Sequence, residues 1–374
     1  MKSVVIAGYA RTPFCFAKKG ELIKVRPDDL AATAVKGVIQ QTGIDANELE
    51  DLVLGCAFPE GEQGLNMARL VVLLAGLPQS VAGVTVNRFC GSSMQAIHQA
   101  AGAIQMNAGH AFICAGVESM TRVAMGGFNP SPNPNLYKAM PQAYMSMGQT
   151  AENLAKQYHI SREQQDAFAV ASQHKAAAAQ AAGNLADEIV AVGNVTQDGC
   201  IRADTSLATL ATLKPAFEVN GTVTAGTASP LTDGAAATLV CSEEFAKAHG
   251  LHILARIKSI AVASCAPEIM GIGPVPATLK ALQRANLSIS DLDIIELNEA
   301  FAAQSIACID DLKLDPAKIN LDGGAIALGH PLGASGARIT GKAAALLKRE
   351  GKQFALATQC IGGGQGIATI LEAV

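Results

Sequence analysis

Two cysteines stand beside glycine at places where the chain leaves a strand-like segment. The first, Cys90, lies in TVNRFCGSSMQAIHQAA and is followed by Gly91 and then by apolar residues at helical spacing. A helix N-terminus presents unpaired N–H groups and the positive end of the helix dipole, and both stabilise a thiolate. We therefore expect Cys90 to be a nucleophile with a lowered pKa. A buried structural cysteine is the alternative from this segment alone.

The second cysteine, Cys360, ends an apolar segment in ATQCIGGGQGIA and precedes the triple glycine 362–364. Consecutive glycines allow backbone N–H groups to converge on one oxygen atom without side chains in the way, which suits an oxyanion hole. A tight turn between two strands is the other interpretation of the same residues.

One histidine and one asparagine occur in similar places. His330 lies in the glycine-rich LDGGAIALGHPLGASGAR, where Pro331 favours an extended conformation of the residue before it. Asn298 follows the strand-like IIEL. Taken singly, these residues could be a loop histidine and a helix N-cap. With the two cysteines they form a set suited to thioester chemistry: a nucleophile, its base, an enolate-stabilising group and a second acid/base.

The elements that must position these residues alternate between strand and helix, which is typical of an α/β protein. The first expected strands are Ser3–Gly8, Leu52–Gly55, Val81–Val86 and Ala111–Gly116.

An irregular region interrupts this alternation. Residues 120–148 contain four prolines and five methionines, and a helix follows with a capping box at Ser161 and Gln164 and an expected end at Gly183. We expect residues 1–119 to form a first half, completed by about 240–265. Residues 120–239 would form an inserted loop domain, and residues 266–374 a second half.

Composition limits the possible functions. The 374 residues are 49% hydrophobic and carry a net charge of −4, which gives no electrostatic footprint for nucleic acid or an anionic membrane. The nine scattered cysteines fit a reducing compartment, so we expect a cytoplasmic protein. No apolar run reaches the ~18–20 residues of a transmembrane segment.

Four segments resemble the motif blocks of the thiolases, in the order of that family: VNRFCGSSMQA, NEAFAAQ, GGAIALGHPLGASGAR and CIGGGQG. The similarity extends over essentially the whole chain. It implies two similar α/β halves stacked as αβαβα layers, with a loop domain inserted in the first. Within the family, CGSSMQA, EIMGIGPVPA and GQGIAT resemble the bacterial 3-ketoacyl-CoA thiolases that are β-subunits of fatty-acid oxidation complexes.

The resemblance also implies a role for each catalytic residue. Cys90 would attack the 3-keto carbon of a 3-ketoacyl-CoA, and His330 would take its proton and then hold the thioester oxygen. Asn298 would hold a water molecule in the same oxyanion hole, and Cys360 would protonate the enolate of acetyl-CoA. The N–H groups of Cys90 and Gly362 would hold the oxygen of the acyl-enzyme.

The remaining implied contacts are with CoA and the acyl chain. Arg202 and Ser229 match contacts to the adenine-nucleotide and pantetheine parts, and Met147 and Phe301 match residues of the acyl pocket. CoA would be a substrate, with no permanently bound cofactor and no metal. A homodimer or homotetramer is expected, with a possible complex with a hydratase/dehydrogenase subunit.

Three other functions fit part of the sequence. An acetoacetyl-CoA thiolase would make acetoacetyl-CoA, but members specific for that substrate typically have His-Met-Gly where this chain has Ser146-Met-Gly. A decarboxylating condensing enzyme such as a ketoacyl synthase would lack the second cysteine, Cys360. An inactive CoA-binding homologue would not need the complete catalytic set. We therefore expect degradative cleavage of medium-chain substrates.

Overall fold

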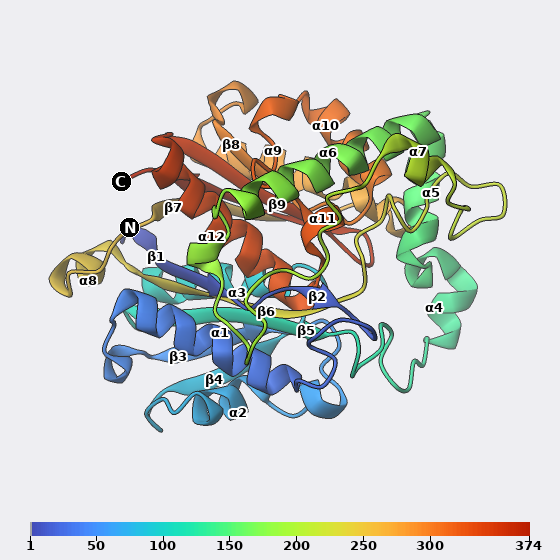
Figure 1. The fold of residues 1–374 in the computed structure, drawn as a ribbon. Helices are drawn as coiled ribbons and strands as arrows, with labels where there is room; N and C mark the ends of the chain where they lie inside the picture. Colours follow the sequence, from blue (N-terminus) through green and yellow to red (C-terminus); the bar gives the residue numbers. More distant parts are fainter. Residues whose placement is uncertain (1) are drawn as a thin grey trace.

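The computed structural model describes residues 2–374, which form a mixed α/β protein (Figure 1). Its strands are β1 (Val4–Arg11), β2 (Cys15–Phe16), β3 (Asp51–Gly55), β4 (Ala82–Val86), β5 (Ala111–Ser119), β6 (Thr232–Ser242), β7 (Ala255–Ser264), β8 (Ile294–Leu297), β9 (Phe354–Ile361) and β10 (Gln365–Glu372). Nine of them follow the order β4-β3-β5-β6-β1-β7-β10-β9-β8, and β2 pairs with β6. The junction between β1 and β7 contains only two residue pairs, so two halves of the sheet meet there.

Helices cover both faces of these strands. They are α1 (Pro27–Thr42), α2 (Met67–Leu74), α3 (Ser92–Gln105), α4 (Pro134–Ala139), α5 (Met147–Gln157), α6 (Arg162–Ala181), α7 (Leu207–Ala211), α8 (Glu243–Ala248), α9 (Pro274–Ala285), α10 (Ala302–Leu312), α11 (Ala325–Leu328) and α12 (Leu332–Glu350). Among residues 2–374, none of these helices combines the length and apolar character that crossing a bilayer requires.

Alternate residues of each strand contact different helices, as expected for strands that are covered on both faces. In β3, Leu52 and Leu54 share a core with α1 and α2, whereas Val53 shares one with α3. In β9, Leu356 packs with α9 and α10, and Ala357 packs with α12. Because α3 and α12 also pack on each other, the layers run helix, sheet, helix, sheet, helix. This confirms the expected αβαβα arrangement.

The two halves have the same pattern of strand pairing. In the first, β3 lies parallel between β4 and β5, and β6 and β1 continue antiparallel. In the second, Ile295 of β8 forms a parallel bridge with Ile319, β8 is parallel to β9, and β10 and β7 continue antiparallel. Cys90 and His330 therefore occupy equivalent places, just before the two middle helices α3 and α12.

The region between β5 and β6 contains α4 to α7; α4, α5 and α7 lie at the right in Figure 1, away from the chain ends. The predicted capping box of Ser161 and Gln164 begins α6, and Gly183 follows it with a φ of 79°. Two expected boundaries differ. β6 begins at Thr232, inside the range expected for the insertion. β7 pairs at eight positions with β10, so residues 255–264 belong to the second half rather than completing the first.

Candidate active site

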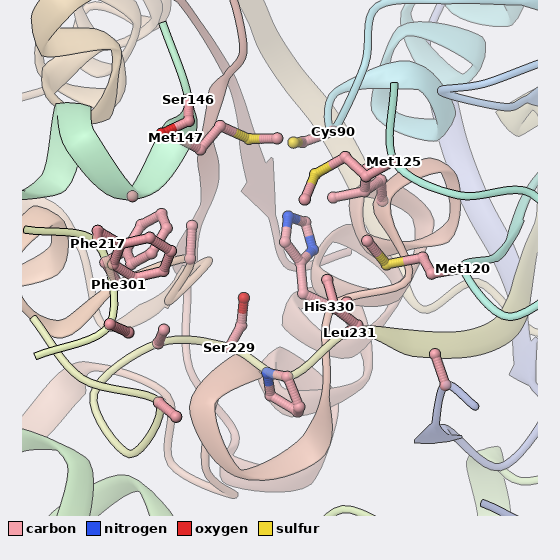
Figure 2. Close-up of a pocket in the computed structure, with 18 of the residues that line it drawn as sticks. Cys90, Met120, Met125, Ser146, Met147, Phe217, Ser229, Leu231, Phe301 and His330 are labelled. Atoms are coloured by element: carbon pink, nitrogen blue, oxygen red, sulfur yellow. The ribbon is translucent and has the colours of Figure 1, made fainter. Parts of the chain in front are cut away.

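Three of the four catalytic residues expected from the sequence, Cys90, His330 and Cys360, line one cavity of about 590 Å³, and the fourth, Asn298, contacts His330 from behind this lining. Cys90 enters it from the start of α3, His330 from the start of α12, and Cys360 from the end of β9. Figure 2 shows His330 and the methionines 120, 125 and 147 directed into the same space as the Cys90 thiol. Segments separated by hundreds of residues thus contribute to a single site.

Cys90 lies in a strained turn between β4 and α3. The preceding Phe89 has a φ of 42°, a left-handed conformation that is uncommon for a large side chain. At Gly91, a Cβ atom would lie 2.6 Å from Cδ1 of Ile361, so only glycine fits there without displacement. This turn places the thiol in the cavity while leaving it only 2% exposed.

Burial decides the acidity of the Cys90 thiol. Desolvation raises its pKa to about 12, and a hydrogen bond from the Gly362 backbone opposes that rise without overcoming it. The expectation of a lowered pKa is therefore wrong for the resting protein, because the helix terminus cannot offset the loss of water. A thiol of this kind needs an adjacent base before it can act as a nucleophile.

His330 is a buried, neutral imidazole. Desolvation lowers its pKa to about 3, and the positive charge of Arg338 adds to this effect. The Ser335 hydroxyl donates to the carbonyl oxygen of Pro331 at 3.0 Å, so it accepts from Nδ1 of His330 at 2.5 Å. This assignment puts the imidazole proton on Nδ1 and leaves Nε2 as the basic nitrogen.

Asn298 lies beside this basic nitrogen. Its Nδ2 is 3.4 Å from Nε2 of His330, and its backbone N–H donates to Thr358 at 3.0 Å, which extends the pairing of β8 by one residue. The N-cap interpretation is wrong, since Phe301 occupies the N-cap position of α10. The Oδ1 atom of Asn298 is buried and accepts no hydrogen bond from residues 2–374, so it can accept one from a bound molecule.

The glycines after Cys360 form a tight turn between two strands, and they also present a backbone N–H group to the site, as an oxyanion hole requires. Gly363 and Gly364 have φ values of 80° and 83° and join β9 to β10 as a tight turn. The same turn directs the Gly362 N–H at the Cys90 thiol. Cys360 is buried, and desolvation followed by the proximity of Cys90 holds its pKa well above the usual range for a thiol.

The insertion forms the other wall of the cavity. The cavity lining contains all four residues expected to contact CoA or the acyl chain: Arg202, Ser229 and Met147 from the insertion, and Phe301 from the segment before α10. The Ser229 N–H donates to the Ala300 carbonyl at 2.9 Å, which ties the insertion to the segment after Asn298. The rings of Phe217 and Phe301 meet edge to face with centroids 5.8 Å apart (Figure 2).

The charge at the cavity is one-sided. Lys19 and Arg202 line it, and both lie over the ring of Phe16, with Nζ and Cζ 4.3 and 5.2 Å from the ring centroid. The lining contains no aspartate or glutamate among the described residues. The cavity therefore favours a ligand with an anionic end and a long, mostly apolar remainder.

Three contributors were not expected from the sequence. Ser335 fixes the tautomer of His330, and Gln359 donates through Nε2 to the Cys90 carbonyl. The buried Glu118 accepts from the N–H groups of Ala57 and Gly333, both at 2.9 Å, and so holds the start of α12. Ser335 could have been found from its place five residues after His330, whereas no local pattern marks the other two.

A buried thiol, an imidazole base and a second thiol around one cavity define an enzyme that transfers acyl groups through a cysteine. Comparison with known families agrees. Residues 4–244 match the family "Thiolase, N-terminal domain" and residues 251–373 match "Thiolase, C-terminal domain". The chain belongs to the thiolase family.

Individual relatives are similar over their whole length. A 3-ketoacyl-CoA thiolase of Shewanella loihica is 51% identical, with 100% of both chains covered. The crystal structure of human mitochondrial 3-ketoacyl-CoA thiolase in complex with CoA has a TM-score of 0.92 and 38% identity, covering 100% of this chain and 98% of that one. An acetyl-CoA acetyltransferase from Bacillus anthracis has the same TM-score and identity, with 100% and 99% covered.

Proposed function

We propose that this enzyme is a 3-ketoacyl-CoA thiolase of fatty-acid β-oxidation. It cleaves a 3-ketoacyl-CoA with free CoA to give acetyl-CoA and an acyl-CoA shortened by two carbons. The observation that carries the proposal is the meeting of Cys90, His330 and Cys360 at one cavity that is also lined by two cations, Lys19 and Arg202, and by several methionines. The names of the Shewanella and human relatives support the same substrate class.

The first half-reaction forms the acyl-enzyme. Nε2 of His330 takes the proton of Cys90, and the thiolate attacks the 3-keto carbon, whose oxygen is held by the N–H groups of Cys90 and Gly362. The bond between the second and third carbons then breaks, and its electron pair passes to the acetyl-CoA enolate. His330, now protonated at Nε2, and a water molecule held by Asn298 stabilise the enolate oxygen. Cys360 protonates the enolate carbon, and acetyl-CoA leaves.

The second half-reaction regenerates the enzyme. Free CoA gives its thiol proton to the Cys360 thiolate, and its sulfur attacks the acyl-enzyme carbonyl. The bond to Cys90 breaks, and the Cys90 sulfur recovers its proton from His330. A second thiol suits this exchange because its acidity lies much nearer to neutrality than that of a hydroxyl, so proton transfer to and from carbon needs less driving force.

The cavity also supports a proposal for substrate position. The insertion, residues 120–231, would be a CoA-binding domain in which Ser229 contacts the pantetheine arm and Arg202 the adenine nucleotide. Lys19 would meet the phosphates together with Arg202. Met120, Met125 and Met147 would contact the acyl chain, because methionine adapts its shape to apolar ligands. Each additional buried methylene contributes about 0.8 kcal/mol, so medium chains would bind better than short ones.

Thiolysis of four-, eight- and twelve-carbon 3-ketoacyl-CoA under one set of conditions tests the proposal. We expect kcat/KM to rise from the four-carbon to the eight-carbon substrate. The second candidate is an acetoacetyl-CoA thiolase, which the acetyl-CoA acetyltransferase from Bacillus anthracis supports. A preference for the four-carbon substrate would replace the first proposal with this one.

Other observations support proposals for assembly and location. β4 lies at the edge of the sheet, and Leu70, Leu73 and Val84 on or next to it are exposed apolar residues. Exposed edge strands with apolar neighbours favour pairing between chains, so we propose a homodimer. A tetramer, or a complex with a hydratase/dehydrogenase subunit, would add to that dimer. All nine cysteines are free thiols, which supports a cytoplasmic location.

A further inference from the structure

A buried ion pair connects the same two elements as the Asn298–His330 contact. Nη1 of Arg338 on α12 lies 3.2 Å from Oε2 of Glu296 on β8, and both side chains are at most 1% exposed. Glu296 stands two residues before Asn298, so their side chains leave the strand on the same side. Arg338 stands further along the helix that His330 precedes. The ion pair therefore lies between β8 and α12, and the Asn298–His330 contact joins the end of β8 to the start of α12.

The ion pair is not fully satisfied. Oε1 of Glu296 and Nη2 of Arg338 have no hydrogen-bond partner among residues 2–374. The other charges that face Glu296 are already paired. Lys342 of α12 contacts Glu188 at 2.9 Å and Asp322 at 2.6 Å, and these carboxylates also bind Arg11 and Arg349.

From this geometry we infer that Glu296 and Arg338 form a positioning pair. They hold β8 and α12 in register and set the electric field at His330, and hence its strength as the base for Cys90. The inference rests on the role proposed above for His330. Arg338 acts on His330 through its charge, whereas Glu118 on β5 is the charged group that acts on Cys90. A change in the pair therefore alters the base more than the nucleophile.

The pair changes its net charge near neutral pH. Desolvation raises the pKa of Glu296 to about 7 despite Arg338 and Lys342, while the pKa values of Glu188 and Asp322 are lowered, so these two stay ionised. Tyr9 on β1, which also faces Glu296, has a pKa well above its usual value and stays neutral. Below pH 7 the pair carries the charge of Arg338 alone. Above pH 7 it is neutral, and His330 is then a stronger base.

Neither catalytic partner titrates in this range. Burial puts the pKa of His330 at about 3 and that of Cys90 at about 12. Alkylation of Cys90 by iodoacetamide, followed by peptide mapping across pH, reports the strength of the base without any CoA substrate. The thiolysis assay tests the proposed function separately, so failure of one proposal is distinguishable from failure of the other.

Two variants fix the pair in its two charge states. Glu296→Gln keeps the charge of Arg338 at every pH, and Arg338→Gln leaves a buried carboxyl that stays neutral. We expect Cys90 in Arg338→Gln to react at least about threefold faster than in Glu296→Gln, which corresponds to half a pKa unit at His330. The alkylation rate of the wild type should match that of Glu296→Gln below pH 7 and that of Arg338→Gln above pH 7. Glu296→Asp keeps the titratable carboxyl, so its alkylation rate should again change near pH 7 as in the wild type.

The controls separate this role from a structural one. Glu372→Gln removes a carboxylate from the 3.2 Å pair with Arg256, between β7 and β10, and should leave the wild-type profile unchanged. If both variants slow the alkylation of Cys90 equally and keep the pH dependence of the wild type, the pair is merely structural. Should either variant fail to fold, the wild type decides alone: a profile without a step near pH 7 would overturn the inference.

Discussion

At the scale of single residues, the site combines two thiols that burial makes very weak acids with a histidine that burial makes a weak base. None of them is charged in the resting protein, so the cavity admits a long apolar chain without first losing a buried ion pair. In the proposed mechanism, charge appears only when Cys90 transfers its proton to His330. Pairs of groups with opposed environments are characteristic of acid/base sites.

The two thiols should be separable by substitution. Replacing Cys360 by Ser should leave acyl transfer from a simple acyl-CoA to Cys90 largely intact. It should slow exchange of the acetyl-CoA methyl protons by several orders of magnitude, because a hydroxyl is a far weaker acid than a thiol. Acyl-enzyme formation by mass spectrometry and proton exchange by NMR measure the two steps. Equal loss of both would make Cys360 a structural residue.

The tautomer of His330 depends on one hydroxyl. Ser335→Ala removes the acceptor for Nδ1–H, so the proton is no longer confined to Nδ1 and part of the population loses its basic Nε2. We expect the rate of acyl-enzyme formation to fall about tenfold, the effect of one ordinary hydrogen bond. Ser335→Thr keeps the hydroxyl and should recover most of the rate. An unchanged rate in Ser335→Ala would contradict the assignment.

At the scale of elements, the turn before α3 packs closely against the end of β9 and the turn that follows it. Gly91→Ala would place a Cβ atom 2.6 Å from Ile361, and Ile361 precedes the Gly362 N–H that faces Cys90. Overpacking of this kind costs about 1–3 kcal/mol. We expect a lower melting temperature and a larger loss of kcat than of substrate affinity. Gly102→Ala on α3, where a Cβ meets no atom within 4 Å, is the matched control.

The loop after β2 should recognise the phosphate end of the substrate. Lys19→Met should raise KM for CoA thioesters about fivefold, since an exposed ion pair with phosphate contributes about 1 kcal/mol. The KM for a pantetheine thioester, which lacks the nucleotide, should not change. Lys18→Met alters the neighbouring exposed lysine, which does not line the cavity, and serves as the control. Equal effects on both substrates would remove Lys19 from the phosphate site.

At the scale of the whole molecule, the sequence identified those parts of the site that lie within short motifs. Cys90, Asn298, His330 and Cys360 were all predicted, because each stands beside glycine or at a strand end. Residues that meet only through the fold, such as Glu118 with Gly333 or Lys19 over Phe16, leave no local pattern.

Two features of the structure differ from the expectation for physical reasons. β6, with the sequence TDGAAATLVCS, is buried at every position, so it lacks the alternation that marks a half-exposed strand. Its beginning was therefore assigned to the insertion. The pKa of Cys90 differs from the expectation because a sequence shows the helix that follows a residue but not the depth at which the residue is buried.

The edge of the molecule offers a test of assembly. Val84→Lys puts a charge on the exposed face of edge strand β4, where it should oppose pairing between chains. Light scattering after size-exclusion chromatography should show a smaller species than the wild type, with a similar melting temperature. Val374→Lys, at an exposed position away from β4, is the control. A wild type that is already monomeric would contradict the proposed dimer.

The equivalence of Cys90 and His330 in the two halves has a consequence for synthesis of the protein. The ribosome makes the nucleophile within the first quarter of the chain, but its base and its second thiol belong to the last quarter. A nascent chain that has completed β1 to β6 therefore contains Cys90 without the imidazole that can deprotonate it. Cys90 and His330 can act together, as the proposed mechanism requires, only after α12 has docked against α3.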